Sequence, residues 1–427
     1  MEAILAGEVR ARWAWAEPDV WTDRMLMTLE QGVRGGRWYA LMDKVWAPRT
    51  LSAAFARVKA NDGAPGVDHV TVSMFAARQA EWLARLSDDL RTARYRPQPI
   101  RRVWIPKPGR PDRRPLGIPT VRDRIVQAAL RLVLEPIFER EFAAQSYGFR
   151  PNRGCHDALA RVETLLHAGH HHVVDADLKG YFDSIPHERL LARVRTKVTD
   201  GRVLALLEGF LQQEVLEELT SWTPDTGTPQ GAVISPLLAN LYLDPLDHVL
   251  AASGHEMVRY ADDFVVLCRT TAEAANALAQ VTRWTQEAGL ILHPEKTRVV
   301  DVTQPGGFDF LGYHFERGYH WPRAKSVAHL RDALRTKTPR TSGQSLAVII
   351  ADVNRTLRGW YGYFRYSHGS LVPLDKWVRM RLRSILRRPS RRRGRARGRD
   401  HQRWPNALLA AQGLFSLTLA HRADISP

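Results

Sequence analysis

The strongest constraint on the fold is a ten-residue stretch at residues 258–267, which reads VRYADDFVVL and holds two adjacent carboxylates, Asp262 and Asp263. Apolar, β-branched and aromatic residues on both sides predict a hairpin with the aspartates at its tip. Neighbouring strand residues point to opposite faces, so one carboxylate can point fully at a site while the other lies beside it. Because carboxylates this close repel each other, a buried pair either takes a proton or binds a cation.

A third carboxylate, Asp177, ends a short apolar strand expected over residues 172–177. If this strand end and the hairpin tip meet in one sheet, Asp177, Asp262 and Asp263 can surround two metal ions, the arrangement used for in-line phosphoryl transfer. Mg²⁺ is the expected ion, because it prefers hard oxygen ligands and is usually held by one or two carboxylates plus substrate phosphates. Taken alone, an Asp-Asp hairpin tip is more often a solvated turn. The strand-end aspartate and the glycine-rich stretch between the two elements favour a site.

The charge of the chain indicates a polyanionic partner. The 427 residues carry a formal net charge of +17 at pH 7, with an isoelectric point near 10.3. Nucleic acid is favoured over a membrane, because no long apolar span or amphipathic anchor is evident. The two cysteines, Cys155 and Cys268, lack metal-ligand spacing. A disulfide framework and a structural zinc are therefore not expected, which fits a reducing cytosol.

Two further stretches offer groups for phosphates or nucleotides. A basic loop at residues 107–114 joins two expected strands, and its flanking residues Lys107 and Arg114 could cradle phosphates. In residues 226–240, glycines allow close approach of the backbone to a ligand, and Gln230 offers both donors and acceptors. The alternatives are a solvated turn for the first stretch and a loop with a helix cap for the second.

Hydrophobic periodicity predicts the remaining elements. Helices are expected over much of residues 1–60, from 71 to 94, and from 120 to 142, where Pro136 is expected to kink or split the helix. A strand, helix, hairpin, helix, strand order after residue 170 fits a split βαβ sheet, with a further hairpin over residues 307–315. Helical spacing continues through the final third.

A basic run at residues 387–399 follows these helices. Contact with structured RNA is favoured there over a disordered, solvated linker, given the overall charge. The arginines expected to make this contact are Arg387, Arg388, Arg391, Arg392 and Arg393.

Together these motifs resemble the reverse transcriptase and maturase proteins encoded within bacterial group II introns. The similarity runs from residue 63 to residue 406. The most diagnostic motifs, in order, are IPK at 105–107, RPLGIP at 114–119, SYGFRP at 146–151, TPQG at 228–231 and YADD at 260–263.

The family implies an α+β fold, the right-handed polymerase with fingers, palm and thumb. The palm would hold the split βαβ antiparallel sheet and the thumb would be helical. The expected division, in order, is an N-terminal helical extension in residues 1–60, fingers in 61–155, palm with the catalytic site in 156–318, thumb or maturase domain in 319–390, and a basic nucleic-acid-binding segment in 391–427.

The resemblance also implies roles at the catalytic centre. Asp177, Asp262 and Asp263 become the two-metal site. Phe182, five residues past Asp177, matches the bulky side chain that blocks a ribose 2′-hydroxyl and so selects deoxynucleotides. Lys296 matches a candidate general acid for pyrophosphate release, with a surface lysine as the alternative.

Nucleotide and RNA contacts follow from the same resemblance. Lys107 and Arg114 match fingers residues that contact the incoming triphosphate, and Gln230 lies in the loop that borders the nucleotide. Residues 354–364, which include Arg358, resemble the maturase domain, which helps intron RNA to fold and splice.

The expected function is therefore an RNA-directed DNA polymerase that acts with a group II intron RNA in splicing and target-primed retrohoming. Its partners would be intron RNA, target DNA with a primer, and deoxynucleoside triphosphates, without a membrane, and a homodimer stays open. It would work in the bacterial cytoplasm, at the nucleoid when acting on DNA. The chain ends near Pro427 without the endonuclease motifs of many relatives, which resembles the compact class C lineage.

Two alternatives remain. One is a domesticated relative that keeps polymerisation but serves DNA repair or phage defence, and its active site would be the same. The other is a splicing-only RNA-binding maturase. The intact carboxylates Asp177, Asp262 and Asp263 argue against the second, since such proteins need not retain metal ligands.

Overall fold

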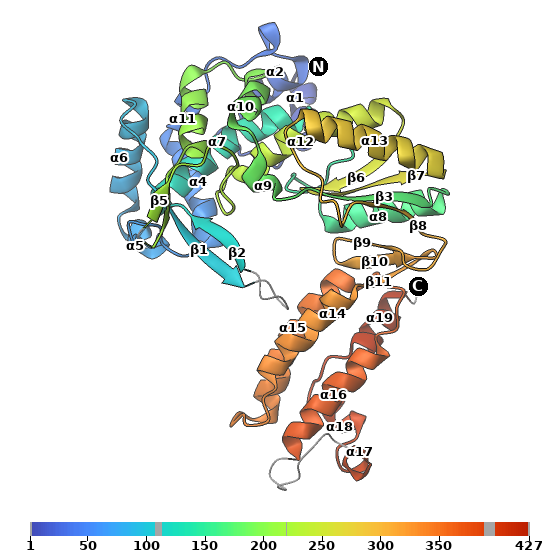
Figure 1. The fold of residues 1–427 in the computed structure, drawn as a ribbon. Coiled ribbons are helices and arrows are strands. Elements are labelled where there is room, and N and C mark those ends of the chain that lie inside the picture. Colours follow the sequence, from blue (N-terminus) through green and yellow to red (C-terminus); the bar gives the residue numbers. More distant parts are fainter. Residues whose placement is uncertain (1, 107–112, 219, 388–397, 426–427) are drawn as a thin grey trace. The chain divides into compact units, whose positions relative to one another are not determined.

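The computed structural model describes residues 2–106, 113–218, 220–387 and 398–425. The chain forms two compact units, residues 1–299 and residues 300–427 (Figure 1). The boundary between them lies inside residues 156–318, the range predicted as palm. Among the described helices, none combines the length and the apolar character that crossing a membrane requires.

The first unit is mainly helical and holds two sheets (Figure 1). Its helices are α1 (Glu2–Arg12), α2 (Asp23–Gln31), the 3₁₀ turn η1 (Arg34–Gly36), α3 (Met42–Val45), α4 (Pro48–Asn61), α5 (Val72–Ala77), α6 (Gln79–Arg91), α7 (Val121–Glu139), α8 (Cys155–His167), α9 (Tyr181–Ser184), α10 (His187–Arg195), α11 (Gly201–Leu211), α12 (Ser235–Ala252) and α13 (Thr271–Glu287). Its strands are β1 (Ile100–Pro106), β2 (Arg113–Ile118), β3 (His172–Asp177), β4 (Val215–Glu217), β5 (Thr220–Trp222), β6 (Glu256–Tyr260), β7 (Asp263–Cys268) and β8 (Arg298–Asp301), within which the boundary to the second unit falls.

One sheet carries the three aspartates and has the strand order β6-β7-β3-β8. β6 and β7 form the predicted antiparallel hairpin, and β3 pairs antiparallel with β7 so that Asp177 stands opposite Asp263. Alternate residues of β3, among them Val174 and Ala176, belong to the main apolar core of the unit. α13 contacts β3 and β7, and α8 contacts β6 and β7. The predicted split βαβ order is confirmed.

The other sheet has the order β2-β1-β4-β5. β1 and β2 confirm the predicted pair of strands and extend it by a few residues. β4 pairs parallel with β1 and antiparallel with β5. Neither β4 nor β5 was predicted, because strands of three residues are too short to show alternation.

Two predicted helices need correction. The helix expected over residues 71–94 is two helices, α5 and α6, which meet at Arg78 with a non-helical φ of −125° and ψ of 29°. The predicted split at Pro136 does not occur, since α7 is continuous to Glu139. Pro136 cannot donate to the carbonyl of Leu132. That carbonyl accepts a hydrogen bond from the indole Nε1 of Trp21 at 3.0 Å instead, so the lost backbone partner is replaced.

The second unit combines a small sheet with helices. Its strands β9 (Phe308–Phe310), β10 (Tyr313–Glu316) and β11 (Tyr319–Pro322) form an antiparallel sheet in the order β11-β10-β9, which confirms the hairpin predicted over residues 307–315. Its helices are α14 (Ala324–Lys337), α15 (Leu346–Phe364), α16 (Val372–Leu386), α17 (Arg399–Arg403), α18 (Asn406–Ala411) and α19 (Leu417–Ile425). A separate apolar core joins α14, α15, α16, α18 and α19, and it includes Leu334, Val353 and Leu382.

Candidate active site

The β6–β7 hairpin presents the two adjacent aspartates on a tight turn. Tyr260 ends β6 and Asp263 begins β7, so Ala261 and Asp262 form the connection. Ala261 has a φ of +60°, in the left-handed region that residues with a Cβ rarely adopt. The contacts around Ala261 must therefore hold the turn in this conformation.

The three aspartates lie where two neighbouring strands meet. Asp177 is paired in register with Asp263. Burial raises the pKa of the Asp262 carboxyl, and the charge of Asp177 adds to this rise, whereas Arg114 and Arg259 lower it. Ionisation of Asp262 is thus less favourable than that of a free aspartate, and a bound cation would offset this cost. A set of hard oxygen donors with this excess of negative charge fits Mg²⁺.

Lys296 lies against this cluster. Its ammonium group forms an ion pair with the Asp177 carboxylate. The turn that carries it is attached to the end of β3, because the amide of His293 donates to the Asp177 carbonyl at 2.7 Å. Lys296 remains about half exposed, with 54% of its side chain accessible. The structure thus brings Lys296 to one of the three predicted metal ligands.

A chain of polar contacts joins the predicted nucleotide-binding residues. Gln230 accepts a hydrogen bond from Arg114 Nε at 3.2 Å and donates to the Asp183 carboxylate at 3.1 Å. Phe182 precedes Asp183, and its ring lies edge-on to that of Tyr181 with 5.5 Å between centroids. The carbonyl of Phe182 accepts from the amide of Thr228 at 2.6 Å, which fixes the glycine-rich loop beside α9. Sequence reasoning missed Asp183, although it lies next to Phe182.

The other predicted residues belong to the second unit or fall outside the described residues. Lys107, Arg388, Arg391, Arg392 and Arg393 fall outside the described residues. In the second unit, the guanidinium of Arg358 lies 4.8 Å from the centre of the Phe415 ring. Arg387 forms an ion pair with Asp400 at 3.2 Å, and only 12% of its side chain is exposed.

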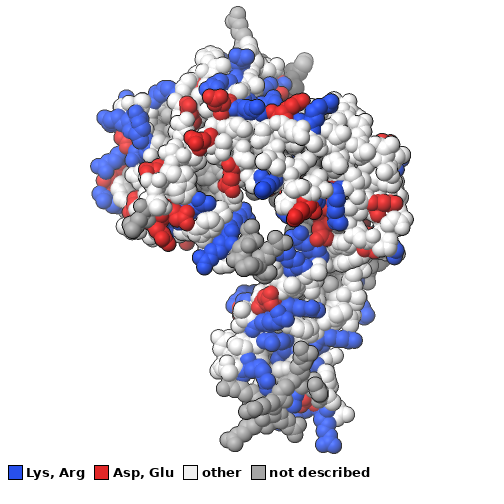
Figure 2. Space-filling view, viewed as in Figure 1, with Lys and Arg blue, Asp and Glu red and all other residues white. Residues whose placement is uncertain are grey.

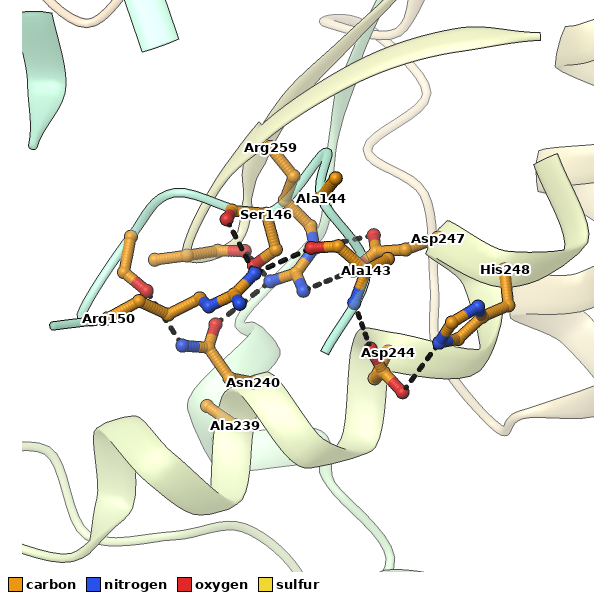
Figure 3. Close-up of polar contacts among 12 residues, drawn as sticks. Ala143, Ala144, Ser146, Arg150, Ala239, Asn240, Asp244, Asp247, His248 and Arg259 are labelled. Atoms are coloured by element: carbon orange, nitrogen blue, oxygen red, sulfur yellow. Dashed lines mark hydrogen bonds and ion pairs between the residues drawn. The ribbon is translucent and has the colours of Figure 1, made fainter. Parts of the chain in front are cut away.

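A buried polar cluster behind the turn was also missed (Figure 3). Arg259 of β6 is fully buried and pairs with the equally buried Asp247 of α12. Its guanidinium also reaches Asn240 and the carbonyl of Ala261. A charged residue inside an otherwise apolar strand was the available signal, because a buried arginine requires a charged partner.

Comparisons with known proteins agree with this geometry. Residues 105–315 match the family described as "Reverse transcriptase (RNA-dependent DNA polymerase)", and residues 327–404 match "Group II intron, maturase-specific domain". Protein YkfC of Escherichia coli (strain K12) is 34% identical over 346 residues, which cover 72% of this chain and 86% of YkfC. The chain belongs to the reverse transcriptase family.

The predicted family, the α+β right-hand fold and the enzyme class, an RNA-directed DNA polymerase, are thereby confirmed, as is the pairing with a maturase region. Group II intron-encoded protein LtrA of Lactococcus lactis subsp. cremoris is 38% identical over 202 residues, covering 47% of this reverse transcriptase but 33% of LtrA. A solved "Cas6-RT-Cas1--Cas2 complex" matches 58% of this chain and 26% of that chain at 24% identity, with a TM-score of 0.37. A score this low adds nothing to the family match.

Proposed function

We propose that this reverse transcriptase copies RNA into DNA at a site formed by Asp177, Asp262 and Asp263. One observation carries the proposal: Asp177 stands in register with Asp263, while Asp262 on the adjoining turn has a pKa raised by burial and by the charge of Asp177. Reverse transcriptases in general use divalent metal ions. Two Mg²⁺ ions bound by these carboxylates would lower the pKa of the primer hydroxyl and stabilise the attacking and leaving oxygens.

The neighbouring residues would bind and select the nucleotide. Gln230 accepts the Nε hydrogen of Arg114, so we assign the Nη groups of Arg114 to the triphosphate, where planar bidentate contacts are strongest. Phe182 packs against the main core, which keeps its ring in one place and suits a barrier to a 2′-hydroxyl. Lys107 would contact the same phosphates. Lys296 would donate a proton to the departing pyrophosphate, since its ammonium already lies at Asp177.

The second unit would bind RNA. Three guanidinium groups surround the ring of Trp377, those of Arg331, Arg335 and Arg381, at 6.0, 5.8 and 5.9 Å from its centre. Figure 2 shows Lys and Arg side chains along the helices of this unit, with few acidic ones among them. Arginine and aromatic side chains together suit both phosphates and unstacked bases. Arg358, exposed on α15 against the ring of Phe415, would add a contact of the same kind.

The maturase match supports a group II intron RNA as the partner bound by this unit. Splicing of that RNA, followed by copying at a target DNA that supplies the primer, is the proposed cycle. The corresponding place of action is the bacterial cytoplasm, at the nucleoid during copying. The five-part division into extension, fingers, palm, thumb and basic segment belongs to the same proposal.

The decisive test is Mg²⁺-dependent extension of a DNA primer on an RNA template by the natural protein and by Asp262→Ala. We expect extension by the natural protein and its loss in the variant, because the variant removes a metal ligand. Both proteins should bind structured RNA equally, which serves as the control for folding. Absence of extension by the natural protein, with tight RNA binding, would refute the polymerase proposal and favour a maturase that only assists splicing.

A further inference from the structure

A full positive charge is buried directly behind the turn that carries Asp262 and Asp263. Arg259 is three residues before Asp262, and neither its side chain nor that of Asp247 is exposed to solvent. The two side chains form a double contact, with Arg259 Nε donating to Oδ1 of Asp247 at 2.7 Å and Nη2 donating to Oδ2 at 2.5 Å. The guanidinium is therefore held in one orientation.

The third nitrogen of this guanidinium reaches the turn itself. Nη1 of Arg259 donates to the carbonyl of Ala261 at 2.9 Å and to Oδ1 of Asn240 at 3.0 Å. Ala261 is the residue whose φ of +60° sets the turn, and it immediately precedes Asp262. Asp247 on α12 fixes the guanidinium, and the guanidinium in turn holds the carbonyl of Ala261. The position of the two aspartates therefore depends on the position of α12.

Asn240 extends the contact to the loop before α8 (Figure 3). Its Nδ2 donates to the carbonyl of Gly148 at 2.7 Å. That loop runs beside β6. The backbone amide of Arg259 donates to the backbone carbonyl of Gln145 at 2.9 Å, and the amide of Tyr147 donates to the Arg259 carbonyl at 2.8 Å. A Cβ on Gly148 would overlap the backbone of Ala261 and Tyr260. The turn is thus enclosed by this loop on one side and by the guanidinium on another.

A second arginine anchors the same loop. Arg150 Nη1 donates to the carbonyls of Ala143 and Ser146 at 2.6 and 2.9 Å, and the rest of its guanidinium pairs with Glu139 at the end of α7. The SYGFRP motif at residues 146–151 therefore has a structural task here. It supplies the glycine that touches the turn and the arginine that secures the loop.

Stability alone does not explain a buried ion pair at this place. Replacing such a pair by apolar residues of similar volume is often neutral or stabilising, so its presence is weak support for a role in stability. Arg259 instead contacts the backbone of the one turn residue with a left-handed conformation. Residues that orient metal ligands from behind typically change metal affinity or activity about 10–100-fold when they are altered.

We propose that Arg259, held by Asp247 and Asn240, is a positioning residue that sets the spacing of Asp262 and Asp263 and so tunes the affinity of the site for a divalent cation. The proposal rests on the proposed polymerase function and deepens it. Arg259 touches no substrate. It acts on the two aspartates from behind, through its hydrogen bond to the carbonyl of Ala261 and through its charge, which Arg259→Lys retains.

The test measures Mn²⁺ binding by electron paramagnetic resonance, together with single-nucleotide extension kinetics, on the full chain. Arg259→Lys keeps the charge and one contact with Asp247 but cannot reach Asp247, Asn240 and Ala261 at once. We expect Mn²⁺ affinity and kcat to fall about tenfold or more, with the KM for the nucleotide changed by less than about twofold. Asn240→Ala, which leaves the ion pair intact, should lower the Mn²⁺ affinity and kcat by a smaller factor.

Asp200→Ala is the matched control. Asp200 is a buried carboxylate of the same unit that accepts four backbone amides and does not contact the turn. At a temperature where the control and Arg259→Lys are equally folded, the control should keep the natural Mn²⁺ affinity. Natural Mn²⁺ affinity and kcat in both Arg259→Lys and Asn240→Ala would overturn the proposal. If the natural protein fails to extend a primer, the polymerase proposal fails, whereas weaker Mn²⁺ binding in Arg259→Lys alone would still support the positioning role.

Discussion

Arginine works in two opposite environments in this reverse transcriptase. Arg259 in the first unit has no exposed side-chain surface, and it donates hydrogen bonds to Asp247, Asn240 and a backbone carbonyl. In the second unit, Arg358 is exposed and lies over an aromatic ring. All the contacts of Arg259 are with other groups of the protein, whereas the exposed guanidinium of Arg358 is accessible to a ligand. The same residue type can therefore serve precision in one unit and salt-dependent binding in the other.

The largest expected effect that sharpens this contrast is on stability. Asp247→Ala would leave the charge of Arg259 buried without its carboxylate, and breaking one half of a buried pair typically costs about 3–5 kcal/mol. Arg358→Ala, which removes an exposed contact with Phe415, should cost no more than about 1 kcal/mol. Urea unfolding of both variants beside the natural protein gives the comparison. Equal losses would mean that burial does not separate the two arginines.

The next effect concerns the charge of Asp262. Burial raises its pKa, so protonation is favoured in the folded state relative to the unfolded state. Below its unfolded pKa of 3.8 the carboxyl is protonated in both states and does not affect the free energy of unfolding. As the pH rises from there through the folded pKa, the free energy of unfolding falls, because the carboxyl ionises more readily in the unfolded state. Without metal, Asp262→Asn should therefore be more stable than the natural protein at pH 7 and equal to it below pH 3.8.

Added Mg²⁺ should reduce this advantage of Asp262→Asn. The natural protein should gain about 1.4 kcal/mol when Mg²⁺ is tenfold above its dissociation constant, and Asp262→Asn should gain less. Thermal unfolding at pH 7, with and without Mg²⁺, measures both parts. A variant that gains as much from Mg²⁺ as the natural protein would remove Asp262 from the metal site.

Local patterns were sufficient for the elements that carry the motifs. The apolar runs around Asp262 predicted the hairpin, and the strand ending at Asp177 predicted its neighbour in the sheet. The predictions that were wrong or missing concern elements that depend on partners far away in the sequence. Pro136 stays inside α7 because Trp21, far away in the sequence, supplies the missing donor. The short strand β4 pairs with β1, which lies about 110 residues earlier in the chain, and β5 pairs only with β4.

The buried cluster shows the same limit within the site. Arg259 stands in the sequence beside the aspartates, yet its partners Asp247 and Asn240 belong to α12, and Gly148 comes from another loop. A sequence without aligned relatives does not indicate which acid neutralises a buried arginine. The pairing follows only once α12 packs against β6. The catalytic residues were thus predictable from the motifs, whereas the buried residues that hold the turn in place were not.

The smallest expected effect lies in the second unit. Arg335 is exposed on α14 beside Trp377, and its pairing with Asp332 on the same helix is open to solvent. If this surface binds RNA through phosphates, Arg335→Gln should weaken binding about equally for all sequences and reduce the slope of log affinity against log salt by about 1. Filter binding of a structured RNA over a range of KCl concentrations measures the slope. Arg78→Gln, an exposed arginine paired with Glu81 on α6, is the matched control in the first unit and should leave the slope unchanged. If the control lowers the slope as much as Arg335→Gln does, RNA binding is spread over both units, and the contrast between a positioning arginine and a binding arginine applies to single residues rather than to whole units.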